Sequence, residues 1–124
     1  GILAVSALKL GARQAVAMDI DPQALLATRE NALRNGVESH LLVSADRSCD
    51  GAVADVLVAN ILAGPLVELA PLLADRVHPG GRIALSGLLL DQAERVTAAY
   101  RPWFDIALAA ARDDWALLAG QRRA

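Results

Sequence analysis

Residues 15–36 have the sequence AVAMDIDPQALLATRENALRNG. The run from Ala15 to Ile20 is short and apolar apart from an acid at its end, which is typical of a parallel strand covered on both faces. Asp21 and Pro22 follow as the N-cap and first residue of a helix, which we predict to end near Asn35. The segment therefore predicts a strand that passes directly into a capped helix.

Apolar spacing and capping residues predict three further helices. Residues 2–10 are apolar nearly all round, so we expect a short helix that is buried against a sheet. Residues 62–73 carry leucines at helical spacing, and Pro71 should kink that helix. Asp91 and Glu94 resemble a capping box that opens a further helix. In the helix that begins at Pro22, the residues expected on the inward face are Leu25, Leu26 and Leu33.

The remaining apolar runs read as strands. We predict these strands at residues 41–44, 53–59, 82–86, 103–111 and 115–119. Pro79-Gly80-Gly81 should form a tight turn before the third of them, and Arg112-Asp113-Asp114 should join the last two as an antiparallel hairpin. Strands that alternate with helices predict an α/β domain with a mostly parallel sheet and an antiparallel C-terminal hairpin.

Composition narrows the class of protein. The chain has 124 residues, of which 55% are hydrophobic and 21% charged, so we expect one folded domain spanning residues 1–124. The formal net charge of -2 indicates no excess of basic residues such as nucleic-acid binding requires, so we predict no direct binding to nucleic acid. Cys49 is the single cysteine, which favours a reducing compartment. We expect a cytoplasmic monomer without a membrane segment.

Two polar residues lie at or just beyond the ends of predicted strands, where parallel sheets bind their ligands. Asp19 could accept hydrogen bonds from two ribose hydroxyls, or it could be a solvated acid at the end of a strand. Asn60 could hold an incoming amine through its carboxamide, or it could be a helix N-cap, and the two roles are compatible. His40, His78 and Cys49 lack partners at the spacing of a metal site, so no metal is predicted. The absence of a strong acid–base pair favours chemistry driven by a reactive cofactor.

Several segments together resemble a known family. They are GILAVSALKLGA (residues 1–12), AVAMDIDPQALLATRENALRNGV (15–37), ADVLVANILAGPLVELAP (54–71), PGGRIALSGLL (79–89) and DDWALLAG (113–120). These segments are similar to the catalytic domain of the PrmA family, bacterial methyltransferases of large-subunit ribosomal protein eleven. The resemblance covers essentially the whole chain.

The resemblance implies a Rossmann-like class I methyltransferase fold that uses S-adenosyl-L-methionine. The family's sheet has seven strands in the order 3-2-1-4-5-7-6, the last pairing being antiparallel. We expect the chain to be N-terminally truncated, without the first strand and most of the glycine-rich loop. Gly1 would be the last glycine of that loop, Asp19 would bind the ribose hydroxyls, and Asn60 would lie at the methionine end of the cofactor.

The implied function is transfer of methyl groups to amino groups, on lysine side chains and the N-terminal amine, of a large-subunit ribosomal protein. Asn60 is the candidate catalytic residue, and Gly1, Asp19 and Asn60 are the candidate cofactor-binding residues. One alternative is that residues 1–124 form a catalytically silent fragment of such an enzyme. Another is a nicotinamide-binding Rossmann domain, which also carries an acid after its second strand.

Overall fold

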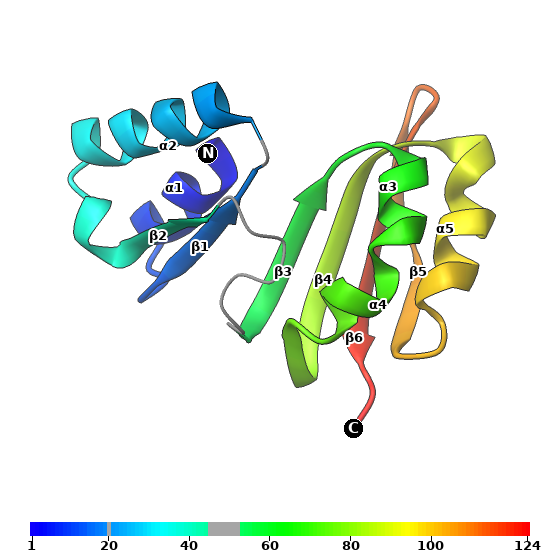
Figure 1. Ribbon diagram of the computed structural model, residues 1–124. Helices are drawn as coiled ribbons and strands as arrows, with labels where there is room; N and C mark the ends of the chain where they lie inside the picture. Colours follow the sequence, from blue (N-terminus) through cyan, green and yellow to red (C-terminus); the bar gives the residue numbers. More distant parts are fainter. Residues whose placement is uncertain (20, 45–52) are drawn as a thin grey trace. The chain divides into compact units, whose positions relative to one another are not determined.

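A computed structural model of the chain describes residues 1–19, 21–44 and 53–124, which form parts of two compact units, Gly1–Ala52 and Val53–Ala124 (Figure 1). The first unit contains α1 (Ile2–Lys9), β1 (Ala15–Met18), α2 (Pro22–Arg34), the 3-10 helix η1 (Glu38–His40) and β2 (Leu41–Ser44). The second contains β3 (Ala54–Asn60), α3 (Ala63–Glu68), α4 (Ala70–Ala74), β4 (Val77–Leu89), the 3-10 helix η3 (Leu90–Gln92), α5 (Ala93–Tyr100), β5 (Phe104–Arg112) and β6 (Trp115–Arg122). None of the described helices combines the length and apolar character that crossing a bilayer requires.

The first unit is built on a pair of parallel strands. β1 lies beside β2 in a register that runs from Ala15 opposite Leu41 to Met18 opposite Ser44. Both strands were predicted, although β1 ends at Met18 and Ile20 lies outside the described residues. α1 and α2 pack against the pair around a small core of Val5, Leu8, Ala32 and Val37.

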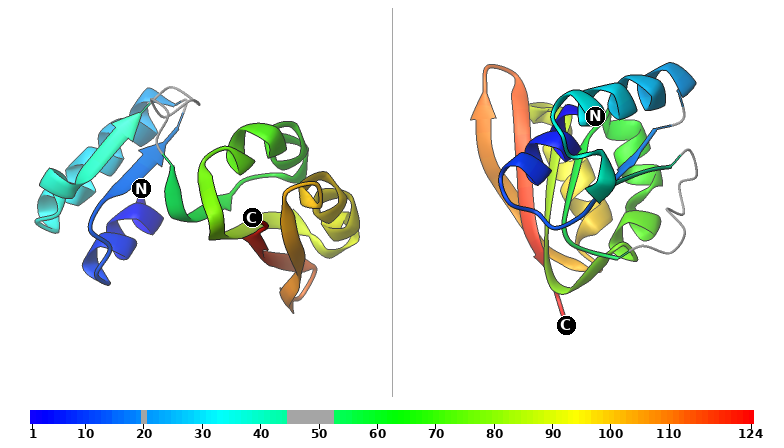
Figure 2. Two further views of the ribbon diagram at one scale, coloured as in Figure 1. Left: turned by 90° about the horizontal axis from the view of Figure 1, so that it is seen from below. Right: turned by 90° about the vertical axis from the view of Figure 1, so that its left-hand side faces the viewer.

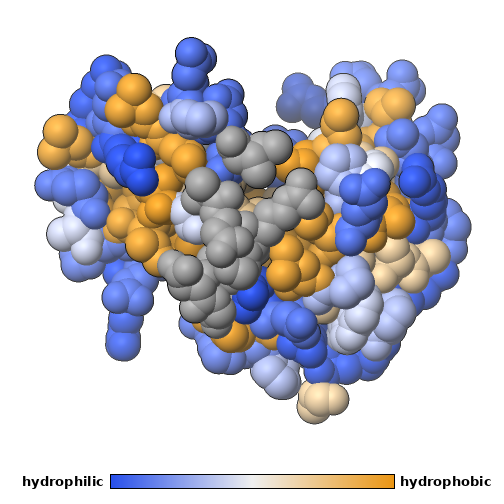
Figure 3. Space-filling model, viewed as in Figure 1, coloured by the Kyte–Doolittle hydropathy of each residue, from blue (hydrophilic) through white to orange (hydrophobic). Residues whose placement is uncertain are grey.

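The burial expected for the first helix is only partly right. Val5 and Leu8 of α1 are buried, whereas Ile2 is 74% exposed and Leu10, just beyond the helix, is 88% exposed. Only a narrow apolar stripe of α1 is therefore buried within the first unit. Figure 3 shows that apolar residues lie on the surface of each of the two units.

The predicted inward face of α2 is wrong at two of its three leucines. Leu25 is buried, but Leu26 and Leu33 are exposed, and the buried positions are instead the smaller Thr28 and Ala32. The reason is that α1 packs on the face of α2 that carries Thr28 and Ala32, whereas Leu26 and Leu33 lie on another face. A Cβ placed on Gly1 would lie only 2.5 Å from the Thr28 Oγ1, so there is no room for a leucine at this crossing.

The second unit contains a four-stranded sheet in the order β3-β4-β6-β5. β3 and β4 are parallel, while β6 runs antiparallel to both β4 and β5. If β1 is numbered as the family's second strand, the pairs observed here are 2-3 and 4-5-7-6. The resemblance implied this arrangement, and it is confirmed for the strands that the structure describes.

Helices α3, α4 and α5 lie along one face of this sheet (Figure 1 and Figure 2). They bury its inward side chains in the main core, whose largest members are Leu66, Val77, Ile83, Leu85, Leu88, Val96, Tyr100, Phe104 and Leu118. The kink predicted at Pro71 is a break: α3 ends at Glu68, and α4 begins two residues later with Pro71 in its first turn. Proline is tolerated there because the first turn of a helix leaves its N–H groups unpaired.

Two local details in and after β4 differ from prediction. The strand runs from Val77 to Leu89, so the turn expected at Pro79-Gly80-Gly81 lies within it as an irregularity, at which Gly80 has a φ of 82°. The capping box expected from Asp91 and Glu94 is absent. The Gln92 side chain accepts a hydrogen bond from the Leu89 backbone N–H at 2.9 Å instead.

The predicted hairpin of β5 and β6 is confirmed, with Asp113 in its turn at a φ of 55°. Trp103 packs against the main core, whereas Trp115 is 53% exposed. The two arginines after Gln121 contact other elements of the second unit. Arg122 donates to the backbone oxygens of Ala74 and Val77, both at 2.7 Å, so it satisfies carbonyls at the end of α4 and the start of β4.

Tyr100 is fully buried in the second unit and donates a hydrogen bond of 2.7 Å to the backbone oxygen of Leu66. Its ring is tilted by 56° against that of Phe104, with the centroids 6.1 Å apart. Burial raises the pKa of the Tyr100 phenol well above its ordinary value of 10.0. The folded protein thus retains this proton at a pH at which the unfolded chain releases it.

We expect Tyr100→Phe in the full-length protein to lower the free energy of unfolding by about 1–3 kcal/mol at neutral pH, because the Leu66 carbonyl is left unpaired in the core. The contribution of Tyr100 is present below the unfolded pKa and is lost as the pH rises above it. The difference between the two proteins should therefore shrink above a pH of about 10. Urea unfolding over a pH series measures both effects, and identical midpoints at neutral pH would contradict the first.

Candidate functional site

Asp19 directly follows β1, where its backbone N–H continues the ladder by donating to the Ser44 oxygen at 3.2 Å. Its carboxylate is exposed, and one oxygen, Oδ1, accepts the Asp21 N–H at 3.0 Å. The bond from Asp19 to a residue two positions on is an Asx turn, which fixes the carboxylate at the strand end. Because a carboxylate offers about four acceptor sites, Asp19 retains the capacity to accept two hydroxyl groups.

Asp21 has the different role that the sequence predicted. Its Oδ1 accepts the backbone N–H of Gln23 at 3.0 Å, so Asp21 is the N-cap of α2. The two neighbouring acids are therefore distinguished by their local geometry: Asp21 caps a helix, and Asp19 presents its carboxylate beyond the strand.

Gly1 is the N-cap of α1, and its backbone oxygen accepts the Val5 N–H at 3.0 Å. Besides the Thr28 Oγ1, a Cβ at this position would meet the Thr28 Cβ and Cγ2 at 2.7 Å. Thr28 cannot easily give way, because it is buried and its hydroxyl donates to the Ala24 oxygen at 2.8 Å. Packing thus supplies a reason for glycine here, independent of the predicted role of Gly1 in a cofactor loop.

Asn60 is the last residue of β3, opposite Ser86 of β4 in the parallel register, and it is exposed. The alternative role as a helix N-cap is wrong, because α3 begins at Ala63 and its N-cap is Leu62. The carboxamide of Asn60 instead lies close to Gly87, where an added Cβ would fall 2.8 Å from the Asn60 Oδ1. Asn60 thus lies at the C-terminal end of a parallel strand, the edge at which such sheets bind ligands.

Gly87 adjoins Asn60, and the sequence pattern did not predict this contact. The predicted strand ended at Ser86, but β4 continues through Gly87 to Leu89. A glycine within an apolar strand indicates a bulge or a close backbone approach, and that signal was present in the segment RIALSGLLL. Asp19 and Gly1 belong to the first unit and Asn60 to the second. A common cleft for Asp19 and Asn60 therefore stays a prediction.

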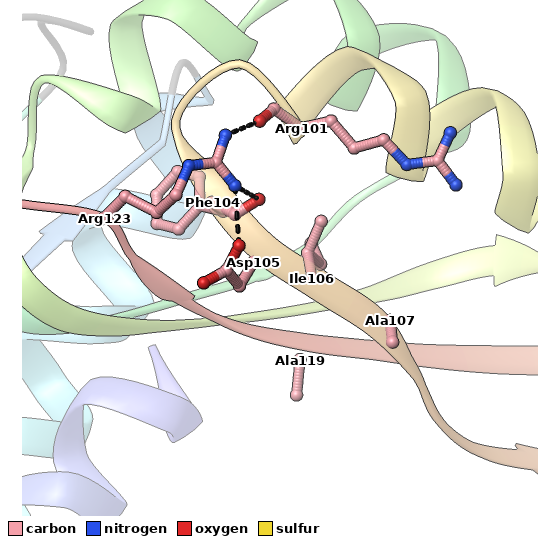
Figure 4. A pocket seen from close by; sticks show the side chains of 7 residues that line it. All are labelled: Arg101, Phe104, Asp105, Ile106, Ala107, Ala119 and Arg123. Carbon is pink, nitrogen blue, oxygen red and sulfur yellow. Dashed lines mark hydrogen bonds and ion pairs between the residues drawn. The ribbon is translucent and has the colours of Figure 1, made fainter.

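One pocket of the second unit adjoins the end of α5 and the start of β5, and Figure 4 shows the side chains that line it. Arg123 donates to the Asp105 Oδ1 at 2.7 Å and to the oxygens of Phe104 and Arg101. Arg101 is paired with Glu94 at 2.9 Å. The Arg123 guanidinium thus joins β5 to the end of α5, the Arg101 guanidinium pairs with a residue of its own helix, and none of the predicted site residues lines this pocket.

Three further residues were named from the sequence: His40, His78 and Cys49. His40 and His78 are exposed, on η1 and β4, and Cys49 lies outside the described residues. Within residues 1–19, 21–44 and 53–124, no three His, Cys, Asp or Glu side chains gather as a metal would require.

The chain is similar in sequence to known proteins over nearly its whole length. Residues 1–123 match the family model described as Ribosomal protein L11 methyltransferase (PrmA). The chain is 56% identical over 124 residues to a ribosomal protein L11 methyltransferase of Shewanella piezotolerans, with 99% of this chain covered. It is also 56% identical over 125 residues to the protein of that name from Pseudomonas aeruginosa, with 100% covered. The chain spans 42% of the length of each of these relatives.

Solved structures give the same result. A ribosomal protein L11 methylase from Lactobacillus delbrueckii subsp. bulgaricus superposes with a TM-score of 0.91 at 32% identity, covering 100% of this chain and 66% of that one. An RNA methyltransferase from Salinibacter ruber, solved in complex with S-adenosyl-L-homocysteine, gives 0.70 at 19% identity, with 99% and 74% covered, and shares the fold. The predicted class I methyltransferase fold is therefore confirmed. With a family model matched over residues 1–123, the chain belongs to the ribosomal protein L11 methyltransferase (PrmA) family.

Proposed function

We propose that this chain forms part of the catalytic domain of a protein methyltransferase that uses S-adenosyl-L-methionine. The whole protein would transfer methyl groups to the lysine side chains and N-terminal amine of large-subunit ribosomal protein eleven. The observation that carries the proposal is the family match over residues 1–123, together with 56% identity to relatives named for that activity. We further propose that it acts in the cytoplasm, as a monomer and without direct contact to nucleic acid.

The residues present fit the cofactor. Asp19 holds an exposed carboxylate beyond a parallel strand, with lone pairs left for a vicinal diol such as that of ribose. Gly1 places the start of α1 against α2 and would form the end of the loop that meets the methionine part. When bound, S-adenosyl-L-methionine supplies an activated methyl group, so the protein's task is chiefly to position the acceptor.

Asn60 would provide that positioning. Its carboxamide offers an acceptor oxygen and two N–H donors at the end of β3. An amine that donates one N–H to the Asn60 oxygen would keep its lone pair free to attack the activated methyl group. Since a lysine ammonium has a reference pKa of about 10.4, its proton must leave to solvent before attack, and desolvation of the amine helps this loss.

The direct test uses the full-length protein with purified ribosomal protein eleven and labelled S-adenosyl-L-methionine. We expect label in the ribosomal protein and mass increments of whole methyl groups on amine-bearing peptides. A substrate whose amines have all been acetylated is the control and should take up none. Absence of label from the unmodified substrate, or equal label in the acetylated one, would contradict amine methylation.

Cofactor binding by the 124-residue chain on its own is a separate question. Among the described residues, β1 pairs only with β2, and β3 pairs on one side with β4, so each leaves an open edge that invites self-association. We therefore expect the 124-residue chain to bind S-adenosylhomocysteine weakly or not at all by calorimetric titration. A micromolar dissociation constant would contradict the silent-fragment alternative.

The nicotinamide-binding alternative receives no support from the family match. A thermal-shift comparison on the full-length protein separates the two cofactor classes. S-adenosylhomocysteine should raise the melting temperature, because it binds only the folded state, and NAD should leave it unchanged.

A further inference from the structure

β4 contains a bulge at Ser86 and Gly87. On the side of β6, Leu85 lies opposite Leu118 and Leu88 lies opposite Ala116. β4 thus advances three residues where β6 advances two, so one residue is extra. Gly87 has a φ of 86°, the left-handed conformation that glycine adopts in bulges of this kind. Bulges often lie next to active sites, where they redirect a neighbouring side chain.

The other side of this bulge faces the end of β3. Asn60 lies opposite Ser86, and the Ile61 N–H donates to the Ser86 oxygen at 3.2 Å. A Cβ on Gly87 would lie 2.6 Å from the Ile61 oxygen, 2.8 Å from the Asn60 Oδ1 and 2.9 Å from the Ile61 nitrogen. All three separations are too short for a real Cβ. An added methyl group would therefore displace the Asn60 carboxamide, the backbone that carries it, or both.

We propose that Gly87 is a positioning residue: its missing side chain lets the Asn60 carboxamide lie against β4 in the orientation that holds the acceptor amine. The inference rests on the proposed function for the role of Asn60. The contact itself is independent of that function, because it is a property of the bulge and of the end of β3. Gly87 touches neither substrate nor cofactor in this account and acts only through Asn60.

Gly80 provides a matched control on the same strand. Its φ of 82° is nearly that of Gly87, so alanine meets the same backbone strain at either position. However, nothing lies within 4 Å of a Cβ at Gly80. A comparison of Gly80→Ala with Gly87→Ala therefore separates the effect of backbone strain from the effect of pushing on Asn60.

The first test is a double-mutant cycle in the full-length protein, measuring kcat for methylation of the ribosomal protein. We expect Gly87→Ala to lower kcat by about 10- to 100-fold, because small misplacements of a positioning group have costs of this order. Gly80→Ala should leave kcat unchanged. In an Asn60→Ala background, Gly87→Ala should cause no further loss. Losses that multiply, or an unchanged kcat in Gly87→Ala, would overturn the proposal.

The second test does not depend on activity. The carboxamide NMR signals of Asn60 are those that disappear in Asn60→Ala. They should shift in Gly87→Ala and stay in place in Gly80→Ala. If the wild-type protein transfers no methyl group but these signals shift, the proposed function fails and the positioning contact stands. Unshifted signals would overturn the contact. Loss of folding in Gly87→Ala alone would also overturn the proposal, because the contact would then be a requirement of the fold.

Discussion

Replacing Asn60 by alanine in the full-length protein should lower kcat for amine methylation by about 100- to 1,000-fold, the cost typical of removing one preorganised polar group from a reacting centre. The physical reason is the position of Asn60 at the end of β3, where the carboxamide would hold the amine before transfer. Since α3 is capped at Leu62, the substitution removes no helix cap, and the fold should be retained.

Steady-state kinetics with the ribosomal protein measure this effect, and circular dichroism checks the fold. Asn60→Asp keeps the size and an acceptor oxygen but loses the N–H donors, so its kcat should fall between those of the wild type and Asn60→Ala. Asn35→Ala, which removes an exposed carboxamide at the end of α2, is the matched control and should retain kcat. An unchanged kcat in Asn60→Ala would remove Asn60 from the reaction.

The second large effect is expected at Asp19. Asp19→Ala in the full-length protein should weaken binding of S-adenosylhomocysteine by about 10- to 100-fold, the loss expected when charge-assisted hydrogen bonds to ribose hydroxyls are removed. Asp19→Asn keeps one acceptor oxygen, and with it the Asx turn to the Asp21 N–H, so it should lose less.

Asp21→Asn controls for the loss of a nearby negative charge. Asparagine caps helices as well as aspartate does, so α2 should remain capped and cofactor affinity should stay unchanged. Calorimetric titration with S-adenosylhomocysteine measures all three variants. Equal affinities of the wild type and Asp19→Ala would show that the carboxylate does not hold the ribose.

Local patterns in the sequence were enough to predict most elements. The strands that begin at Ala15 and Leu41, the N-cap at Asp21 and a disturbance of the helix at Pro71 all follow from residues close together in the chain. Such features depend on turn chemistry, capping and apolar runs, which short segments encode. The positions of Asp19 and Asn60 just past or at strand ends could be predicted in the same way.

The structure differs from the predictions where residues far apart in the chain contact one another. Leu26 and Leu33 are exposed because α1 covers the face of α2 that carries Thr28 and Ala32, and the spacing of leucines within one helix carries no information on which face a neighbouring helix covers. The bulge at Gly87 likewise depends on the register of β6, about thirty residues further along the chain. Asn60 was given a possible capping role because the sequence does not reveal that two more residues precede the helix.

The anchoring of Arg122 has a mechanical consequence for the site. Arg122 ties the end of β6 to the carbonyls of Ala74 and Val77, and β6 in turn sets the register of β4 at the bulge. These contacts thus connect a residue more than sixty positions beyond Asn60 to the strand that pairs with β3. Because β4 is the only described strand between β6 and β3, a change at the C-terminal end of the chain can reach the end of β3 through a single shared neighbour.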